Sequence, residues 1–166
     1  MHTSFITARL LLNELTVNDA AFIKKLVNTE GWIKFIGERN VKSHEDAVAY
    51  IQKIIDNPNT NYLVVTRRDS QIPIGIVTFI KRDYLEHHDI GFAFLPQYIG
   101  QGYAYEATAA VLESLLKNPL HQCILATTLK KNINSIRLLE RLNFKFDREI
   151  EAGNEKLSVY AFKNRG

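Results

Sequence analysis

One stretch of the chain decides the fold: Phe92-Ala93-Phe94-Leu95-Pro96-Gln97-Tyr98-Ile99-Gly100-Gln101-Gly102-Tyr103-Ala104. An apolar strand pattern runs into a loop with two closely spaced glycines, and a helix pattern begins directly after them. Glycine allows a left-handed backbone and lets a ligand approach the main-chain amides closely. A helix N-terminus adds unpaired N–H groups and the positive end of the helix dipole. The stretch therefore predicts a site for an anionic group such as a phosphate or pyrophosphate.

Two common phosphate-binding patterns do not fit this loop. The Walker pattern needs Gly-Lys-Ser/Thr after the loop, and the sequence has none there. The dinucleotide fingerprint needs a small residue where Tyr105 stands and an acidic residue about 20 positions later. That later region reads Leu120-His121-Gln122-Cys123-Ile124 and contains no acid. The loop therefore either binds a different phosphate ligand or is a glycine-rich turn without a ligand.

Strand and helix patterns alternate on both sides of the loop and predict one domain over residues 1–166. The expected helices cover 16–29, 43–56, 103–117 and 132–142. The expected strands cover 6–15, 61–68, 72–81, 89–95, 122–128, 144–150 and 156–162. Short links within 61–95 favour antiparallel hairpins, whereas a helix at 103–117 crosses over to a parallel neighbour. The expected class is α/β (α+β), a mixed sheet of about seven strands with about four helices.

Composition and charge narrow the set of partners. The 166 residues carry 21 basic and 18 acidic side chains, for a net charge of +3, and the basic ones come as scattered pairs. Nucleic acid requires concentrated positive charge, so we do not expect it as a partner. No apolar stretch approaches the roughly 20 residues of a membrane span and no signal-peptide pattern is present, so we expect a cytoplasmic protein without a membrane partner. The one cysteine, Cys123, excludes an internal disulfide, and no spacing predicts a metal site.

Four motifs carry a resemblance to a known family. Gln97-x-x-Gly100-x-Gly102, followed by Tyr103-Ala104, resembles the acetyl-coenzyme A (acetyl-CoA) pyrophosphate loop of the GNAT N-acetyltransferase superfamily, whose pattern is Gln/Arg-x-x-Gly-x-Gly/Ala. The other three motifs resemble the branch that contains the N-terminal-alanine acetyltransferases of ribosomal proteins: Thr7-x-Arg9-Leu10-x-Leu12, Asp89-Ile90-Gly91-Phe92, and Asn132-x-x-Ser135-x-x-Leu138 with Leu142-Asn143-Phe144. They lie in the family's order and span nearly the whole chain.

The resemblance implies a GNAT-like fold with a splayed pair of parallel strands at the cofactor cleft. Acetyl-CoA would be the cosubstrate, its pantetheine arm pairing with the open edge of the strand before the loop. The implied cofactor-binding residues are Phe92, Phe94, Leu95, Gln97, Gly100, Gln101, Gly102, Tyr103, Ala104, Asn132 and Arg137. Asn132 is equally well explained as a helix N-cap, and Arg137 as part of a solvated basic face. One of Tyr103 and Tyr105 is expected to face the ligand and the other to pack.

The implied chemistry is direct attack of a primary amine on the thioester. Asp89 is the candidate general base, with an exposed strand-end aspartate as the alternative. His87 and His88 have a suitable intrinsic pKa but are expected to be solvated turn residues. The family's tyrosine acid aligns with Leu139, so we assign its role to Ser135, which could instead be a local helix-cap hydroxyl. Asn143 stands where the family has glycine, and asparagine tolerates the left-handed backbone that such a site needs.

The acceptor is expected to be a protein N-terminus or a small amine, bound by the segments 29–43 and 84–88. Trp32, Phe35 and Ile36 could line its pocket, and three acidic residues could attract a cationic amine: Glu30, Glu38 and Glu86. The alternative function is a non-catalytic sensor module that binds acyl-CoA without turnover, which the missing tyrosine allows. A homodimer is compatible with the sequence.

Overall fold

One mixed sheet of eight strands organises residues 4–164, which the computed structural model describes. The spatial order of its strands is β1-β2-β3-β4-β5-β6-β8-β7. The strands are β1 (Ser4–Ile6), β2 (Leu10–Glu14), β3 (Thr60–Arg67), β4 (Pro73–Ile80), β5 (Asp89–Phe94), β6 (Cys123–Thr128), β7 (Lys145–Ala152) and β8 (Glu155–Lys163). The α-helices are α1 (Ala20–Val27), α2 (Glu30–Phe35), α3 (His44–Asp56), α4 (Tyr103–Leu116) and α5 (Ile133–Arg141). Two 3-10 turns are η1 (Val17–Asp19) and η2 (Pro96–Tyr98). The predicted α/β class with a mixed sheet is confirmed.

The N-terminal strand differs from the prediction. The segment 6–15 is not one strand, because Thr7 closes a tight turn onto Leu10 and makes an antiparallel hairpin of β1 and β2. The Thr7 backbone N–H donates to the Leu10 carbonyl at 2.9 Å, and the Leu10 N–H donates to the Thr7 hydroxyl at 3.1 Å. This turn accounts for the eighth strand.

A fifth helix, α2, also escaped prediction. Thr29 is its N-cap, accepting a hydrogen bond from the Trp32 backbone N–H at 3.3 Å. Six residues are too few for an apolar periodicity to appear in the sequence. The segment predicted as an acceptor-binding loop is therefore partly helical.

The helix caps follow the sequence signals closely. Ser43 and Asp46 form a reciprocal capping box at the start of α3, with bonds of 3.0 and 3.1 Å. Thr16 makes the same motif with Asp19 ahead of α1. At the end of α5, Asn143 adopts φ 71°, the left-handed backbone expected where the family has glycine.

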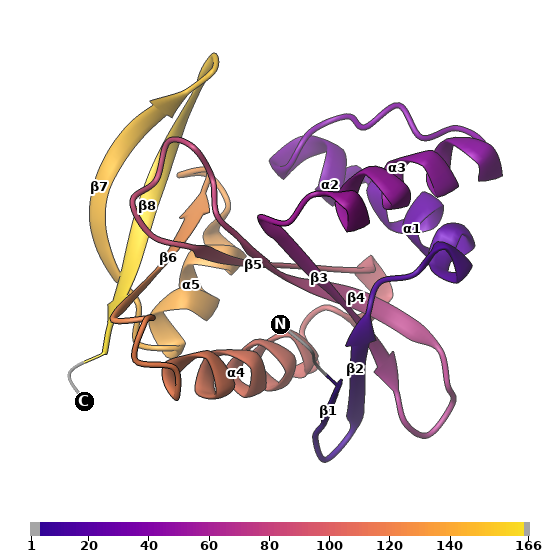
Figure 1. The fold of residues 1–166 in the computed structure, drawn as a ribbon, viewed down its shortest axis with the longest axis horizontal. Coiled ribbons are helices and arrows are strands. Elements are labelled where there is room, and N and C mark those ends of the chain that lie inside the picture. The colour runs from indigo at the N-terminus through magenta and orange to yellow at the C-terminus, as the bar shows by residue number, and fades with distance from the viewer. Residues whose placement is uncertain (1–3, 165–166) are drawn as a thin grey trace.

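The helices cover the two faces of the sheet in separate groups. Figure 1 shows α1, α2 and α3 gathered on one side of β3 and β4, with α4 and α5 on the other. Alternate residues of β3 point to opposite faces of the sheet. Leu63 and Val65 pack with α4 on one face, and Val64 packs with α1 and α3 on the other. None of the helices in residues 4–164 has the length and hydropathy needed to cross a bilayer.

The sheet opens between β5 and β6. Within the described residues these parallel strands pair at one position, Asp89↔Leu125, where the Leu125 N–H also donates to the His88 carbonyl at 2.9 Å. On its other side β5 pairs with β4 along its whole length, from Asp89 to Phe94. Figure 1 shows β6, β8 and β7 diverging from β1–β5 beyond this point. The predicted splayed parallel pair is confirmed, and it leaves one edge of β5 open.

Candidate active site

The loop after β5 has the backbone geometry that its glycines predict. Leu95 is still extended, with its N–H bonded to the Ile74 carbonyl at 2.9 Å, and Pro96 then begins η2. Proline cannot continue the hydrogen-bond ladder, so the chain leaves the sheet here. Gly100 and Gly102 have φ of 83° and 84°. Gly102 is the N-cap of α4 and has no side chain to offer, so the first-turn amides are suited to an anionic ligand.

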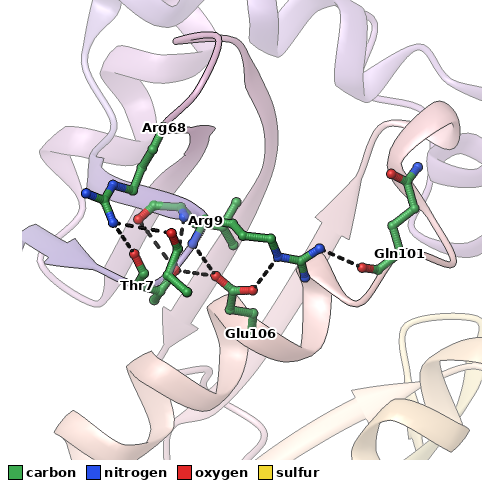
Figure 2. A network of polar contacts seen from close by, with 7 residues as sticks. Thr7, Arg9, Arg68, Gln101 and Glu106 are labelled. Atoms are coloured by element: carbon green, nitrogen blue, oxygen red, sulfur yellow. Dashed lines mark hydrogen bonds and ion pairs between the residues drawn. The ribbon is translucent and has the colours of Figure 1, made fainter.

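An arginine from the N-terminal hairpin holds this loop in place (Figure 2). Arg9 Nη1 donates to the Gln101 carbonyl at 3.0 Å, and Arg9 Nε donates to Glu106 Oε1 at 2.7 Å. Glu106 Oε2 accepts from the Arg9 backbone N–H at 2.9 Å and from the Thr7 hydroxyl at 2.5 Å. Burial works against ionisation of Glu106, but the hydrogen bonds from Thr7 and Arg9 outweigh it and lower the pKa of the carboxyl group. The Thr7-x-Arg9 motif therefore joins the hairpin to the loop and to α4.

Both tyrosines at the start of α4 line the cavity described next, and one of them, Tyr103, also packs in the main core cluster. Tyr103 is buried, and the Arg9 guanidinium carbon lies 4.2 Å from the centroid of its ring. Tyr105 is half-buried, and the Arg141 guanidinium carbon lies 4.5 Å from the centroid of its ring. Each ring is therefore held by a cation from another element.

A cavity of about 930 Å³ occupies the opening between β5 and β6. It brings together ten of the predicted site residues: Asp89, Phe92, Phe94, Gly100, Gly102, Tyr103, Ala104, Asn132, Ser135 and Arg137. Three predicted cofactor-binding residues are outside its lining. Leu95 is buried in the core with α1 and α3, while Gln97 and Gln101 contact each other, with the Gln101 side-chain amide donating to the Gln97 carbonyl at 2.8 Å. Gln101 thus contributes to loop shape through both its side chain and its carbonyl.

The start of α5 forms the opposite wall. Asn132 caps this helix, accepting from the Ser135 backbone N–H at 3.3 Å, and it also lines the cavity, so both interpretations of this residue fit its position. The N-cap is Asn132 and not Ser135, whose side chain is half-buried on the cavity wall. Leu139 is fully buried at the same wall, where the family has its tyrosine.

Asp89 lies at the single point where β5 and β6 meet. It is 2% exposed, so the alternative of an exposed strand-end aspartate is wrong. Arg82 Nε donates to Asp89 Oδ2 at 2.5 Å across the hairpin between β4 and β5. Burial raises the pKa of Asp89, and the charge and hydrogen bond of Arg82 oppose that rise. The result is a buried carboxylate that faces the cavity and has one cationic partner.

The two neighbouring histidines were expected to be solvated, but His88 is partly buried. Its ring stacks on Phe79 with centroids 4.6 Å apart, and the ring of His121 meets both edge-on at 5.1 and 5.4 Å. Burial lowers the pKa of His88 and of His121. Neither ring lines the cavity, so we do not assign either one to the chemistry. Among residues 4–164, no group of three His, Cys, Asp or Glu side chains has the geometry of a metal site.

Sequence reasoning missed two arginines at the site. Arg9 was visible as part of a motif, but its partner Glu106 is 97 positions away. Arg82 gave one usable signal, since it stands seven positions before Asp89 across a predicted hairpin. A hairpin brings such residues to the same end of two paired strands.

Known proteins share this arrangement. Residues 9–145 match the family model described as an acetyltransferase (GNAT) domain. The chain is 31% identical, over 94% of its length and 93% of the relative's, to YnaD of Bacillus subtilis (strain 168), an uncharacterized N-acetyltransferase.

Solved structures match over almost the whole chain. The ribosomal-protein alanine acetyltransferase of Vibrio fischeri superimposes with a TM-score of 0.81 at 18% identity, covering 98% of this chain and 97% of that one. A ribosomal-protein alpha-N acetyltransferase in complex with coenzyme A gives a TM-score of 0.82 at 14% identity, covering 96% of each chain. These two likenesses concern the fold, while the family model and the relative identify the lineage. The chain belongs to the GNAT acetyltransferase family, as its sequence motifs predict.

Proposed function

We propose that this protein is an acetyl-CoA-dependent N-acetyltransferase that transfers an acetyl group to a primary amine by direct attack. The observation that carries the proposal is the open edge of β5, which leads into a loop with two left-handed glycines and then into the N-terminus of α4. An extended amide-bearing arm fits such an edge, and a pyrophosphate fits the amides of Gly100 to Ala104. A Cβ built at Gly100 would meet nothing within 4 Å, so the loop is open on that side.

The chain's own residues supply the acid–base chemistry. Asp89, whose negative charge Arg82 stabilises against the effect of burial, accepts the proton of the incoming ammonium group, directly or through a water. The amine nitrogen then bonds to the thioester carbonyl carbon, the carbon–sulfur bond breaks, and the electron pair leaves with sulfur as thiolate. Ser135, on the opposite wall, donates a hydrogen bond to that sulfur. The second proton of the nitrogen passes to this thiolate, directly or through a water, so the products are the N-acetylated amine and the free thiol of coenzyme A.

Two observations on related proteins support the choice of cosubstrate and acceptor. A structural neighbour was solved in complex with coenzyme A, and its name gives an alpha-N-protein acceptor. We therefore propose acetyl-CoA as cosubstrate and either a protein N-terminus or a small amine as acceptor. We place the reaction in the cytoplasm, because a sequence with one cysteine suits a reducing compartment.

Calorimetric titration with acetyl-CoA and with free coenzyme A tests the proposal, together with mass spectrometry of an amine panel. Micromolar binding of both and acetylation of at least one amine are the expected results. Binding without acetylation of any amine would favour the sensor alternative. No binding of either ligand by folded protein would overturn the proposal.

A further inference from the structure

The cavity extends beyond the cofactor cleft into a second half, which we define by eight lining residues: Trp32, Phe35, Ile36, Arg39, Tyr62, Arg82, Tyr84 and Asp89. They come from α2, the segment that follows it, β3, the connection between β4 and β5, and the first residue of β5. Most are aromatic or aliphatic, and three are charged. We call this half the acceptor half, because an amine must enter it to approach Asp89.

The acidic residues expected to attract a cationic amine do not line this half. Glu38 pairs with Lys42 at 3.1 Å and also accepts from the backbone N–H of Arg39 and of Asn40. Glu86 pairs with Arg148 at 2.9 Å. Glu30 lies exposed in the first turn of α2. None of these three carboxylates is therefore directed at the acceptor half, and the other carboxylate of the cavity lining besides Asp89, Glu155 of β8, is not among its eight residues.

The charges that do line the acceptor half favour an anion. Asp89 is matched by Arg82 at 2.5 Å, so this pair contributes little net charge. Among residues 4–164, no carboxylate forms an ion pair with the Arg39 guanidinium, and Arg39 is exposed on the cavity wall. One unmatched cation therefore remains. A polyamine or an aminoglycoside would bring several positive charges against it.

A buried hydrogen-bond donor lies beside that cation. Trp32 is 5% exposed, and among residues 4–164 its indole N–H has no hydrogen-bond partner. A buried polar group without a partner is unusual and calls for an explanation such as a ligand. The Arg39 guanidinium carbon is 5.8 Å from the centroid of the Trp32 ring. Trp32 and Arg39 both line the acceptor half, so two neighbouring lining residues supply a cation and an unused N–H, and these are a suitable pair of donors for a carboxylate.

We propose that the acceptor is an amine that carries a carboxylate group, bound by Arg39 and the Trp32 N–H while its amino group lies toward Asp89. The aromatic walls of Phe35 and Tyr84 accommodate the part between the two groups. This inference rests on the proposed function. A free amino acid and a peptide with an acidic residue near its N-terminus share the required chemistry.

Matched acceptor pairs test the inference with the full-length wild-type protein and acetyl-CoA. One arm compares free amino acids with their amides. A second compares the C-terminally amidated peptides Ala-Asp-NH2 and Ala-Glu-NH2 with Ala-Asn-NH2 and Ala-Gln-NH2, and spermidine is added as a polycation. We expect kcat/KM to be at least tenfold higher for the carboxylate member in one arm, which identifies the source. Amidation of an amino acid lowers the pKa of its amine and so favours the amide in the chemical step; a preference for the acid therefore reports binding.

The outcomes separate the inference from the proposed function. Equal rates within both arms, or a preference for spermidine, would overturn the inference and leave the acetyltransferase intact. Acetylation of none of these amines or of the wider amine panel would overturn the proposed function and the inference with it.

Two variants localise the effect. Arg39→Met is expected to raise KM for the carboxylate acceptor about tenfold, leave KM for its uncharged partner unchanged, and be partly rescued by Arg39→Lys. Lys25→Met, which removes an exposed cation from α1 outside the cavity lining, is the matched control. Trp32→Phe keeps an aromatic side chain but removes the N–H donor, so KM for the carboxylate acceptor rises while KM for its uncharged partner does not. The smaller side chain leaves a void in the core, so the kinetics are measured where the variant is fully folded. An unchanged KM in both Arg39→Met and Trp32→Phe would contradict the assignment.

Discussion

Replacing Arg9 with methionine probes how the binding loop is held. The substitution keeps an unbranched apolar stem but removes the ion pair with Glu106, the hydrogen bond to the Gln101 carbonyl and the cation stacked on Tyr103. The backbone bond from the residue 9 N–H to Glu106 survives, because it does not involve the side chain. Figure 2 shows the lost contacts to Glu106 and to Gln101, and together with the contact to Tyr103 all three hold the loop or the first turns of α4.

The cost follows from the exposure of these groups. The Arg9 and Glu106 side chains are 45% and 20% exposed, so solvent weakens their ion pair to about 0.5–1 kcal/mol. A hydrogen bond from a charged donor to the carbonyl contributes about 1 kcal/mol at this exposure. The cation–π contact contributes about 0.5 kcal/mol. Arg9→Met should therefore lower the free energy of unfolding by about 2 kcal/mol, a fall in melting temperature of roughly 4–8 °C.

Coenzyme A binding distinguishes a loop-holding role from a general one. Ordering a loosened loop costs free energy on binding, and about 1.4 kcal/mol of that cost raises Kd tenfold. We expect a Kd for coenzyme A about tenfold higher in Arg9→Met, measured by calorimetry at a temperature where the variant is fully folded. Arg68→Met is the matched control, since Arg68 donates to the Thr7 and Ala8 carbonyls of the same hairpin and does not contact the loop. An unchanged Kd in Arg9→Met, or an equal rise in Arg68→Met, would refute the reasoning.

Three further variants give distinct readouts. Asp89→Asn should lower kcat at least 100-fold near neutral pH with little change in Kd for acetyl-CoA, and unchanged turnover would exclude Asp89 as the base. Gly102→Val places a side chain at φ 84° and within 3.2 Å of Arg9 Nη2; stability should fall by about 1–2 kcal/mol and coenzyme A binding should weaken, so wild-type affinity would contradict the loop assignment. Burial lowers the pKa of His88 and His121, so the unfolded chain takes up protons first and the free energy of unfolding declines as pH falls below 6.5. Urea unfolding at several pH values should show a flatter decline in the double variant His88→Phe/His121→Phe, and an equal decline would assign the acid sensitivity elsewhere.

Local backbone chemistry made part of this structure predictable. Gly100 and Gly102 were expected to take left-handed conformations next to a helix start, and Asn143 was expected to do so at a helix end. The spacing of Ser43 and Asp46 predicted the N-terminus of α3. Each of these signals lies within a few residues of the feature that it specifies, so the sequence alone carries it.

The features that escaped prediction depend on residues distant along the chain or on geometry that spacing does not encode. Thr7 looks like a strand residue until its hydroxyl is seen to close a turn and to bind Glu106, 99 positions away. The side chain of Leu95 was expected at the cofactor, but it lies on the face of the sheet that packs against α1 and α3, and the spacing did not show which face that would be. The sequence did not indicate any role for Gly75. A Cβ at this position would lie 2.4 Å from the ring of Phe94, which lines the cavity, so only glycine leaves room for that ring.

Asp89 unites the sheet geometry with the proposed chemistry. Its backbone provides the one register point between β5 and β6, and beyond that point the strands separate to form the cavity. A base placed there lies where the opening begins, in a position fixed by backbone pairing on both sides of the strand. Its side chain is fixed independently by Arg82. Because asparagine keeps the backbone pairing and can still accept a bond from Arg82, Asp89→Asn removes the basic function while both positional constraints persist, and a loss of kcat in a variant with wild-type acetyl-CoA affinity would report the proton transfer itself.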